Sequence, residues 1–118
     1  MNSASGPAMH SESHISPDGQ LRFLVIRMPD GEITMGFEGY PWHTHGDTVA
    51  AFASDSLEAA AERFVGDLLS GKSVIAVSTA AGTIRNVWIT EDPAQERKHC
   101  EPGQTLEFRL WDGTKVDA

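Results

Sequence analysis

The chain of 118 residues has a single cysteine and no long apolar run. Cys100 cannot form a disulfide within the chain, so the cysteine content of the sequence gives no sign of an oxidising compartment. The longest apolar stretches, such as residues 23–26, are far shorter than the ~20 residues of a membrane-spanning helix, so we do not expect a membrane protein. Residues 1–20 contain no Lys or Arg and no apolar segment of the signal-peptide type, so we expect a cytoplasmic protein.

Basic residues are also few. The sequence has 9 Lys and Arg against 17 Asp and Glu, a formal net charge of −8. Nucleic-acid binding depends on cations that neutralise phosphates, so nucleic acid is not expected as a partner. Residues 29–71 hold eight acidic residues and one basic residue, Arg63. This concentration indicates either an ordinary solvated surface or a docking face for a basic protein.

Turn signals and apolar periodicity predict a single α+β domain over residues 21–112, between flexible segments at 1–20 and 113–118. Two Pro-Asp-Gly turns bound the first strand, and an apolar stripe at helical spacing predicts a helix over 56–70. Loops are expected at 39–47 and 91–104. The predicted strands are 21–28, 32–38, 48–53, 72–79, 83–90 and 105–112.

The element order ββ(β)αβββ predicts a two-layer sandwich, in which one amphipathic helix lies on a mostly antiparallel sheet of five to six strands. A single helix leaves the other face of such a sheet without cover. The strands at 21–28 and 83–90 both have large apolar residues on each face. We therefore expect a homodimer in which a second copy covers the open face.

The segment from Tyr40 to Asp47 is the main candidate for a site. His43, His45 and Asp47 are spaced so that their side chains share one face of an extended backbone, an arrangement that suits zinc. Further ligands could come from Glu38 or from the pair His99 and Cys100 in the 91–104 loop.

The string His-x-His-x-Asp resembles the first part of the H-x-H-x-D-H signature of metallo-β-lactamase-like hydrolases. Position 48 is Thr48, where that signature has a His that binds the second metal. The resemblance covers five residues, and the chain is too short for the fold of that family. We therefore do not assign the chain to it.

Other signs of catalysis are weak. The sequence has no Gly-x-Ser-x-Gly elbow, no phosphate-binding loop and no dinucleotide-binding glycine pattern. Cys100 has basic neighbours that could lower the pKa of a thiol, but His99 is adjacent only in sequence, and catalytic pairs meet in space.

Two functions remain open. The preferred one is a small, acidic, non-enzymatic binding domain, and one version of it is an immunity-type protein that neutralises a basic protein. Its candidate binding residues are Tyr40, Trp42, His43, His45 and Trp111. Burial in the core is the alternative for Trp42 and Trp111. The second function is a zinc-dependent hydrolase or metal-binding protein that uses His43, His45 and Asp47.

Overall fold

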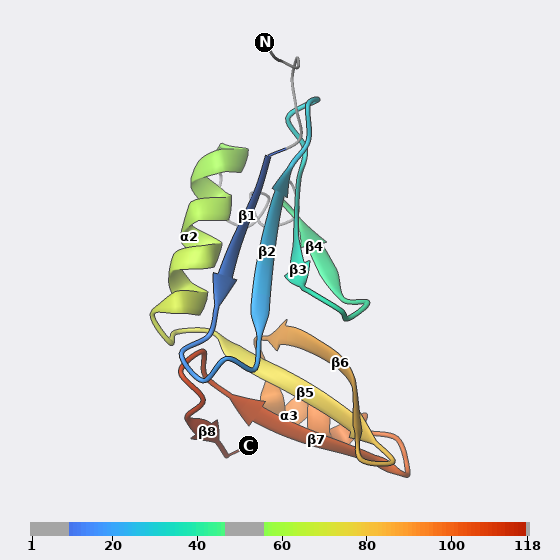
Figure 1. The fold of residues 1–118 in the computed structure, drawn as a ribbon. Helices are drawn as coiled ribbons and strands as arrows, with labels where there is room; N and C mark the ends of the chain where they lie inside the picture. The colour runs from blue at the N-terminus through green and yellow to red at the C-terminus, as the bar shows by residue number, and fades with distance from the viewer. Residues whose placement is uncertain (1–9, 47–55, 118) are drawn as a thin grey trace.

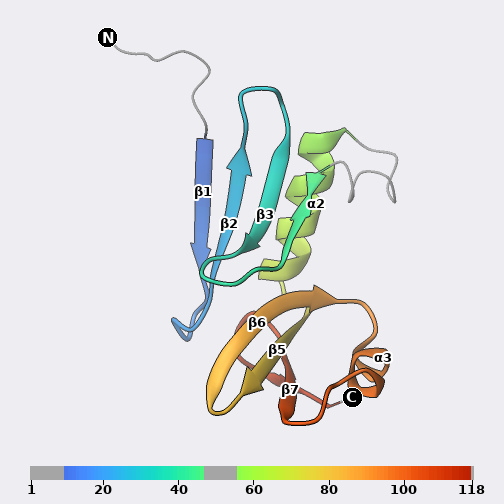
Figure 2. The same cartoon turned by 90° about the vertical axis from the view of Figure 1, so that its right-hand side faces the viewer.

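The computed structural model describes residues 10–46 and 56–117. These residues form two antiparallel four-stranded sheets and one long helix, which confirms the α+β class (Figures 1 and 2). Sheet A contains, in order, β1 (His10–Ile15), β2 (Arg22–Arg27), β3 (Ile33–Phe37) and β4 (His43–His45). Sheet B has the order β6-β5-β7-β8, with β5 (Val74–Ala80), β6 (Thr83–Thr90), β7 (Gln104–Arg109) and β8 (Lys115–Val116). The helices are α2 (Leu57–Leu69) and α3 (Pro93–Lys98).

The strands of the β2–β3 hairpin and helix α2 lie where the sequence predicts two strands and a helix. In the β2–β3 turn the Met28 N–H donates to the Glu32 carbonyl O at 2.7 Å, and Gly31 has φ +92°, which a residue with a side chain rarely adopts. Helix α2 begins where the Ser56 hydroxyl accepts a hydrogen bond from the Ala59 N–H. Its buried residues are Ala60, Ala61, Val65 and Leu68.

The prediction of one sheet with five to six strands is wrong. Residues 10–15, expected to be part of a flexible segment, form β1 and pair with β2; residues 43–45, expected in a loop, pair with β3. Both edges of the β2–β3 hairpin are therefore occupied, and β5 to β7 form a separate sheet. Strand β8 likewise lies in the segment expected to be a C-terminal tail, and α3 lies in the predicted 91–104 loop. The predicted strand at 48–53 lies outside the described residues.

One apolar cluster joins sheet A, α2 and sheet B. Sheet A contributes alternate residues of β2 and β3, which are almost fully buried against α2. Sheet B contributes Ile75 and Val87, and Trp111, just beyond β7, packs into the same cluster. The cluster consists of Leu21, Phe23, Val25, Ile33, Met35, Phe37, Ala61, Val65, Leu68, Ile75, Val87 and Trp111.

The other face of sheet B is covered within the chain. Ala76, Leu106 and Phe108 form a second cluster, against which Trp88 and Cys100 pack. The Trp88 indole N–H donates to Glu96 of α3 at 2.6 Å. Val87 and Trp88, on opposite faces of 83–90, thus both pack inside one chain, so these two residues no longer support a homodimer.

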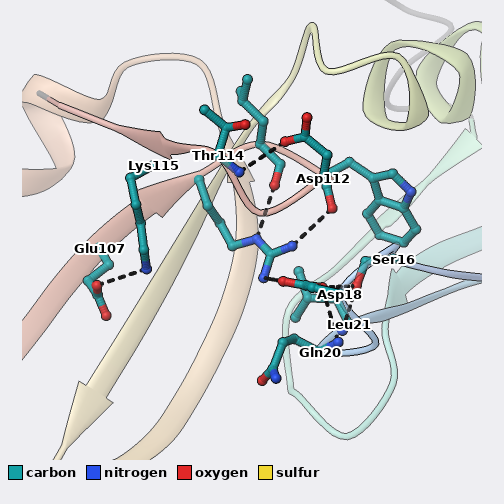
Figure 3. A network of polar contacts seen from close by, with 11 residues as sticks. Ser16, Asp18, Gln20, Leu21, Glu107, Asp112, Thr114 and Lys115 are labelled. Carbon is teal, nitrogen blue, oxygen red and sulfur yellow. Dashed lines mark hydrogen bonds and ion pairs between the residues drawn. The ribbon is translucent and has the colours of Figure 1, made fainter.

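An ion pair between the buried Arg109 and the partly exposed Asp18 fastens the turn between β1 and β2 to the end of β7 (Figure 3). The Arg109 guanidinium, in a residue only 8% exposed, donates to Asp18 at 2.9 Å and to the carbonyl oxygens of Leu110 and Trp111. Hydrogen bonds from the Ser16 hydroxyl and then from Arg109 lower the pKa of Asp18 to about 2. Glu107 of the same strand is exposed, whereas Arg109 and Trp111 are buried between the two sheets.

No helix within residues 10–46 and 56–117 is long and apolar enough to span a membrane.

We predict that Asp18→Asn lowers the free energy of unfolding at pH 7 by about 1–3 kcal/mol, because it leaves the buried Arg109 without its counter-charge. The Asp18 side chain is 32% exposed, which keeps the loss below that of a fully buried pair. A lowered carboxyl pKa stabilises the fold above the unfolded-state value near 3.8, and this contribution is lost as the pH falls towards about 2. Urea unfolding at several pH values measures both effects.

The matched control is Glu107→Gln. Glu107 pairs with Lys115 on the same part of sheet B, but both side chains are exposed, so we expect a change within ~0.5 kcal/mol. Equal losses in the two variants, or an acid transition that Asp18→Asn leaves unaltered, would contradict the role given to Asp18.

Candidate functional site

The segment 39–43 folds back closely over β3. Gly39, with φ +89°, follows β3, and the Tyr40 N–H donates to the Phe37 carbonyl O at 3.2 Å. Gly36 permits the close approach, because a Cβ there would lie 2.7 Å from the carbonyl O of Trp42. The absence of a side chain at position 36 therefore sets the position of β4.

Trp42 ties this segment to both sheets. Its ring packs against Phe37, with the ring centroids 6.1 Å apart, and its backbone N–H donates to the Asn86 side-chain O of β6 at 3.2 Å. The indole is half-buried. Trp42 thus anchors the segment and leaves Tyr40 and His43 at the surface.

The register of sheet A places His43 and His45 on the face opposite α2. His43 pairs with Gly36 and His45 pairs with Thr34, whereas the core residues of β3 are the intervening ones. Directly paired residues point to the same face of a sheet. The same face carries Leu24 and Ile26 of β2, which are half-buried. Helix α2 lies behind the sheet in Figure 2, and no described helix covers this side.

This open face of sheet A contains a shallow hollow of about 240 Å³. Its floor is formed by Leu24, Ile26 and Gly36, and its wall by Tyr40 and His43. Three of the residues that the sequence singled out, Tyr40, Trp42 and His43, line the hollow. His45 follows on the same face of β4. We call this area, from Leu24 and Ile26 to Tyr40, His43 and His45, the open-face site.

The two imidazoles of the open-face site lie side by side, with their ring centroids 5.1 Å apart and nearly perpendicular. His43 Nδ1 is 3.2 Å from the carbonyl O of Pro41, which can accept a hydrogen bond from this ring nitrogen. His45 Nδ1 lies 3.4 Å from the Thr34 hydroxyl and 3.9 Å from the Glu32 carboxylate. The site thus combines an apolar floor with hydrogen-bonding groups at its edge.

Of the predicted metal ligands, the structure brings His43 and His45 together. Over residues 10–46 and 56–117, no three His, Cys, Asp or Glu side chains are grouped so that they could hold a metal ion. Asp47 lies outside the described residues. Glu38 forms an ion pair with Arg22 at 3.5 Å instead.

His99 and Cys100 lie at the end of α3, beside sheet B. The His99 ring contacts the Gln95 side chain, and the Cys100 thiol donates to the carbonyl O of Gln104 at 3.2 Å. Each group therefore has a partner other than its sequence neighbour, and this geometry gives no support to nucleophilic catalysis by Cys100.

The acidic stretch 29–71 is partly neutralised by cations from β2, which precedes it in the sequence. Arg22 pairs with Glu38, and Arg27 pairs with Glu58 of α2 at 2.9 Å. Asp30 and Glu32 lie together at the β2–β3 turn, near His45. The acidic residues around the open-face site are therefore Glu38, which lines the hollow, and Asp30 and Glu32 at this turn.

Trp111 is buried in the core. It is 5% exposed and belongs to the cluster that joins the two sheets, so burial is the correct alternative for this residue.

Sequence reasoning missed Leu24, Ile26 and Gly36. The first two were visible as the second apolar face of strand 21–28. An isolated glycine in the regular alternation of residues 32–38 also signals a close approach of another backbone.

Among known proteins, no family model matches the chain, and no curated protein or solved structure matches it.

We predict that Gly36→Ala destabilises the protein by about 1–3 kcal/mol, because the new methyl group overlaps the Trp42 carbonyl. The control is Gly66→Ala in α2, where a Cβ meets no atom within 4 Å and the gain in helix propensity should stabilise by about 0.5–1 kcal/mol. Chemical unfolding followed by circular dichroism measures both changes. If both variants were stabilised, the segment 39–43 would not lie against β3.

Proposed function

We propose that this chain is a protein-interaction domain whose open-face site binds a basic protein partner. The observation that carries the proposal is the hollow over Leu24, Ile26 and Gly36, an apolar floor on a sheet face that no described helix covers. Large apolar residues on an uncovered sheet face are typical of surfaces that become buried in a complex.

The shape of the hollow favours a protein over a small metabolite. At about 240 Å³ it is smaller than the usual pockets for small molecules, which enclose most of their ligand. It fits one apolar or aromatic side chain of a partner, with Tyr40 and His43 beside it. Tyrosine is enriched among residues that dominate binding energies.

Charge favours a basic partner. The formal net charge is −8, and Asp30 and Glu32 lie at the turn next to His45. A potential of this sign accelerates encounter with a cationic protein and repels acidic ones. Neutralisation of a basic enzyme, as immunity proteins do, is one activity consistent with these features.

The test uses a random-peptide display library as the probe and the full chain as the target. We expect the selected peptides to contain an apolar or aromatic residue flanked by Lys or Arg, and their affinity to fall as salt is raised. Leu24→Glu should weaken binding by ~tenfold or more, because a charge then occupies the floor of the hollow.

The matched control is Ile84→Glu, which places the same charge at an exposed strand residue of sheet B and should leave binding unchanged. Thermal unfolding of both variants reports whether the fold is retained. Failure to select any peptide, or equal binding by wild type and Leu24→Glu, would refute the proposal.

Zinc binding is the second candidate function, and the approach of the His43 and His45 rings is the observation that favours it. Two imidazoles on one face supply only part of a zinc site. Elemental mass spectrometry of untagged protein would show near-stoichiometric zinc that is lost in the double variant His43→Ala, His45→Ala. Absence of bound zinc after incubation with the metal at neutral pH would rule this candidate out.

A further inference from the structure

Strand β1 has an unpaired outer edge. It is the first strand of sheet A and pairs with β2 on one side only (Figure 2). No described strand pairs with its other side. Ser11, Ser13 and Ile15 are exposed, and Ile15 is 57% exposed, a high value for a large apolar residue in a strand.

The hydrogen bonds of the neighbouring turn show which backbone groups face outwards. The Ser16 N–H donates to the Leu21 carbonyl O at 2.9 Å, so Ser16 and Leu21 form a hydrogen-bonded pair. Such pairs alternate along an antiparallel ladder, so His14 and Glu12 also bond to β2. The N–H and C=O groups of Ser11, Ser13 and Ile15 therefore point away from β2.

We propose that two copies of this chain associate through antiparallel pairing of β1 with β1, centred on Ser13. In this register Ser13 faces Ser13 of the second copy, and Ser11 faces its Ile15. Every outward backbone group of these residues then gains a hydrogen bond, and sheet A becomes part of one continuous sheet across the two copies.

The side chains of β1 favour this register over its neighbours. Glu12 lies opposite His14 of the second copy, so a carboxylate meets an imidazole. Within one chain Glu12 already contacts His14 at 2.6 Å and Arg27 at 2.8 Å, and these two groups lower the pKa of Glu12. Pairing centred on Glu12 would oppose two carboxylates, and pairing centred on His14 would oppose two imidazoles.

The dimer uses the outer backbone edge of β1, whereas the open-face site lies on the adjoining face of sheet A, where Ser13 is the direct neighbour of Leu24. The helices α2 of the two copies lie on the same side of the joined sheet, and the two open faces lie on the other. The inference is therefore independent of the proposed function, and the two respond differently to salt. Two copies of charge −8 repel each other, so added salt strengthens the dimer, whereas it weakens binding of a cationic peptide.

Cysteine cross-linking tests the register in a Cys100→Ser background. Ser13→Cys should form a disulfide-linked dimer on mild oxidation, because directly opposed residues of a hydrogen-bonded pair have Cα atoms about 5.5 Å apart. Ser11→Cys is the matched control, on the same strand and face. Its two copies would lie four residues apart along the strands, about 13 Å, and should not cross-link.

Sedimentation equilibrium tests the association itself. We expect wild type and Ser13→Ala to be dimeric at tens of micromolar and Ser13→Pro to be monomeric. The dissociation constant of the dimer should be at least ~tenfold higher for Ser13→Pro. Proline at position 13 removes only an outward N–H, which an edge strand tolerates, and circular dichroism checks the fold. A monomeric wild type, a dimeric and folded Ser13→Pro, or equal cross-linking of the two cysteine variants would overturn the proposal.

Discussion

The buried Arg109 guanidinium is the constraint on which the relation between the two sheets depends. Its residue is 8% exposed, and its donors reach Asp18 from sheet A's first turn and two carbonyl oxygens beyond β7. A cation at this depth is tolerable only when its partners are in place. The position of the 16–20 turn, and with it the paths of β1 and β2, is thereby fixed relative to sheet B. The apolar cluster around Trp111 fills the adjoining space. Its contacts are not directional, whereas the hydrogen bonds of Arg109 are.

Local sequence signals predicted the elements that local interactions form. The β2–β3 hairpin follows from its Pro-Asp-Gly turn and from alternation in 32–38, and α2 follows from its apolar stripe. The β5–β6 hairpin was likewise predicted. In each case the residues that interact are close in sequence, so the spacing of residue types is enough to predict the element.

The edge strands could not be predicted in the same way. Residues 10–15 have one large apolar side chain, and their strand exists because β2 offers a free ladder of backbone groups. Residues 43–45 are in a strand because Gly36 lets them approach β3. Trp111 was predicted as a candidate binding residue, but it is buried by contacts with residues distant in sequence. Within the candidate site, the aromatic and imidazole residues were found from sequence, whereas the floor that gives them a common surface was not.

Strand β1 is held by backbone hydrogen bonds and by the Glu12–Arg27 ion pair, with none of the buried large apolar residues that fix β2 and β3. Its local unfolding free energy is therefore lower than that of the inner strands. Among the described strands β1 pairs with β2 alone, so it can be ordered only where β2 is in place. The outer edge of β1 therefore exists only on a folded molecule. A dimer formed through this edge selects folded copies over partly folded ones.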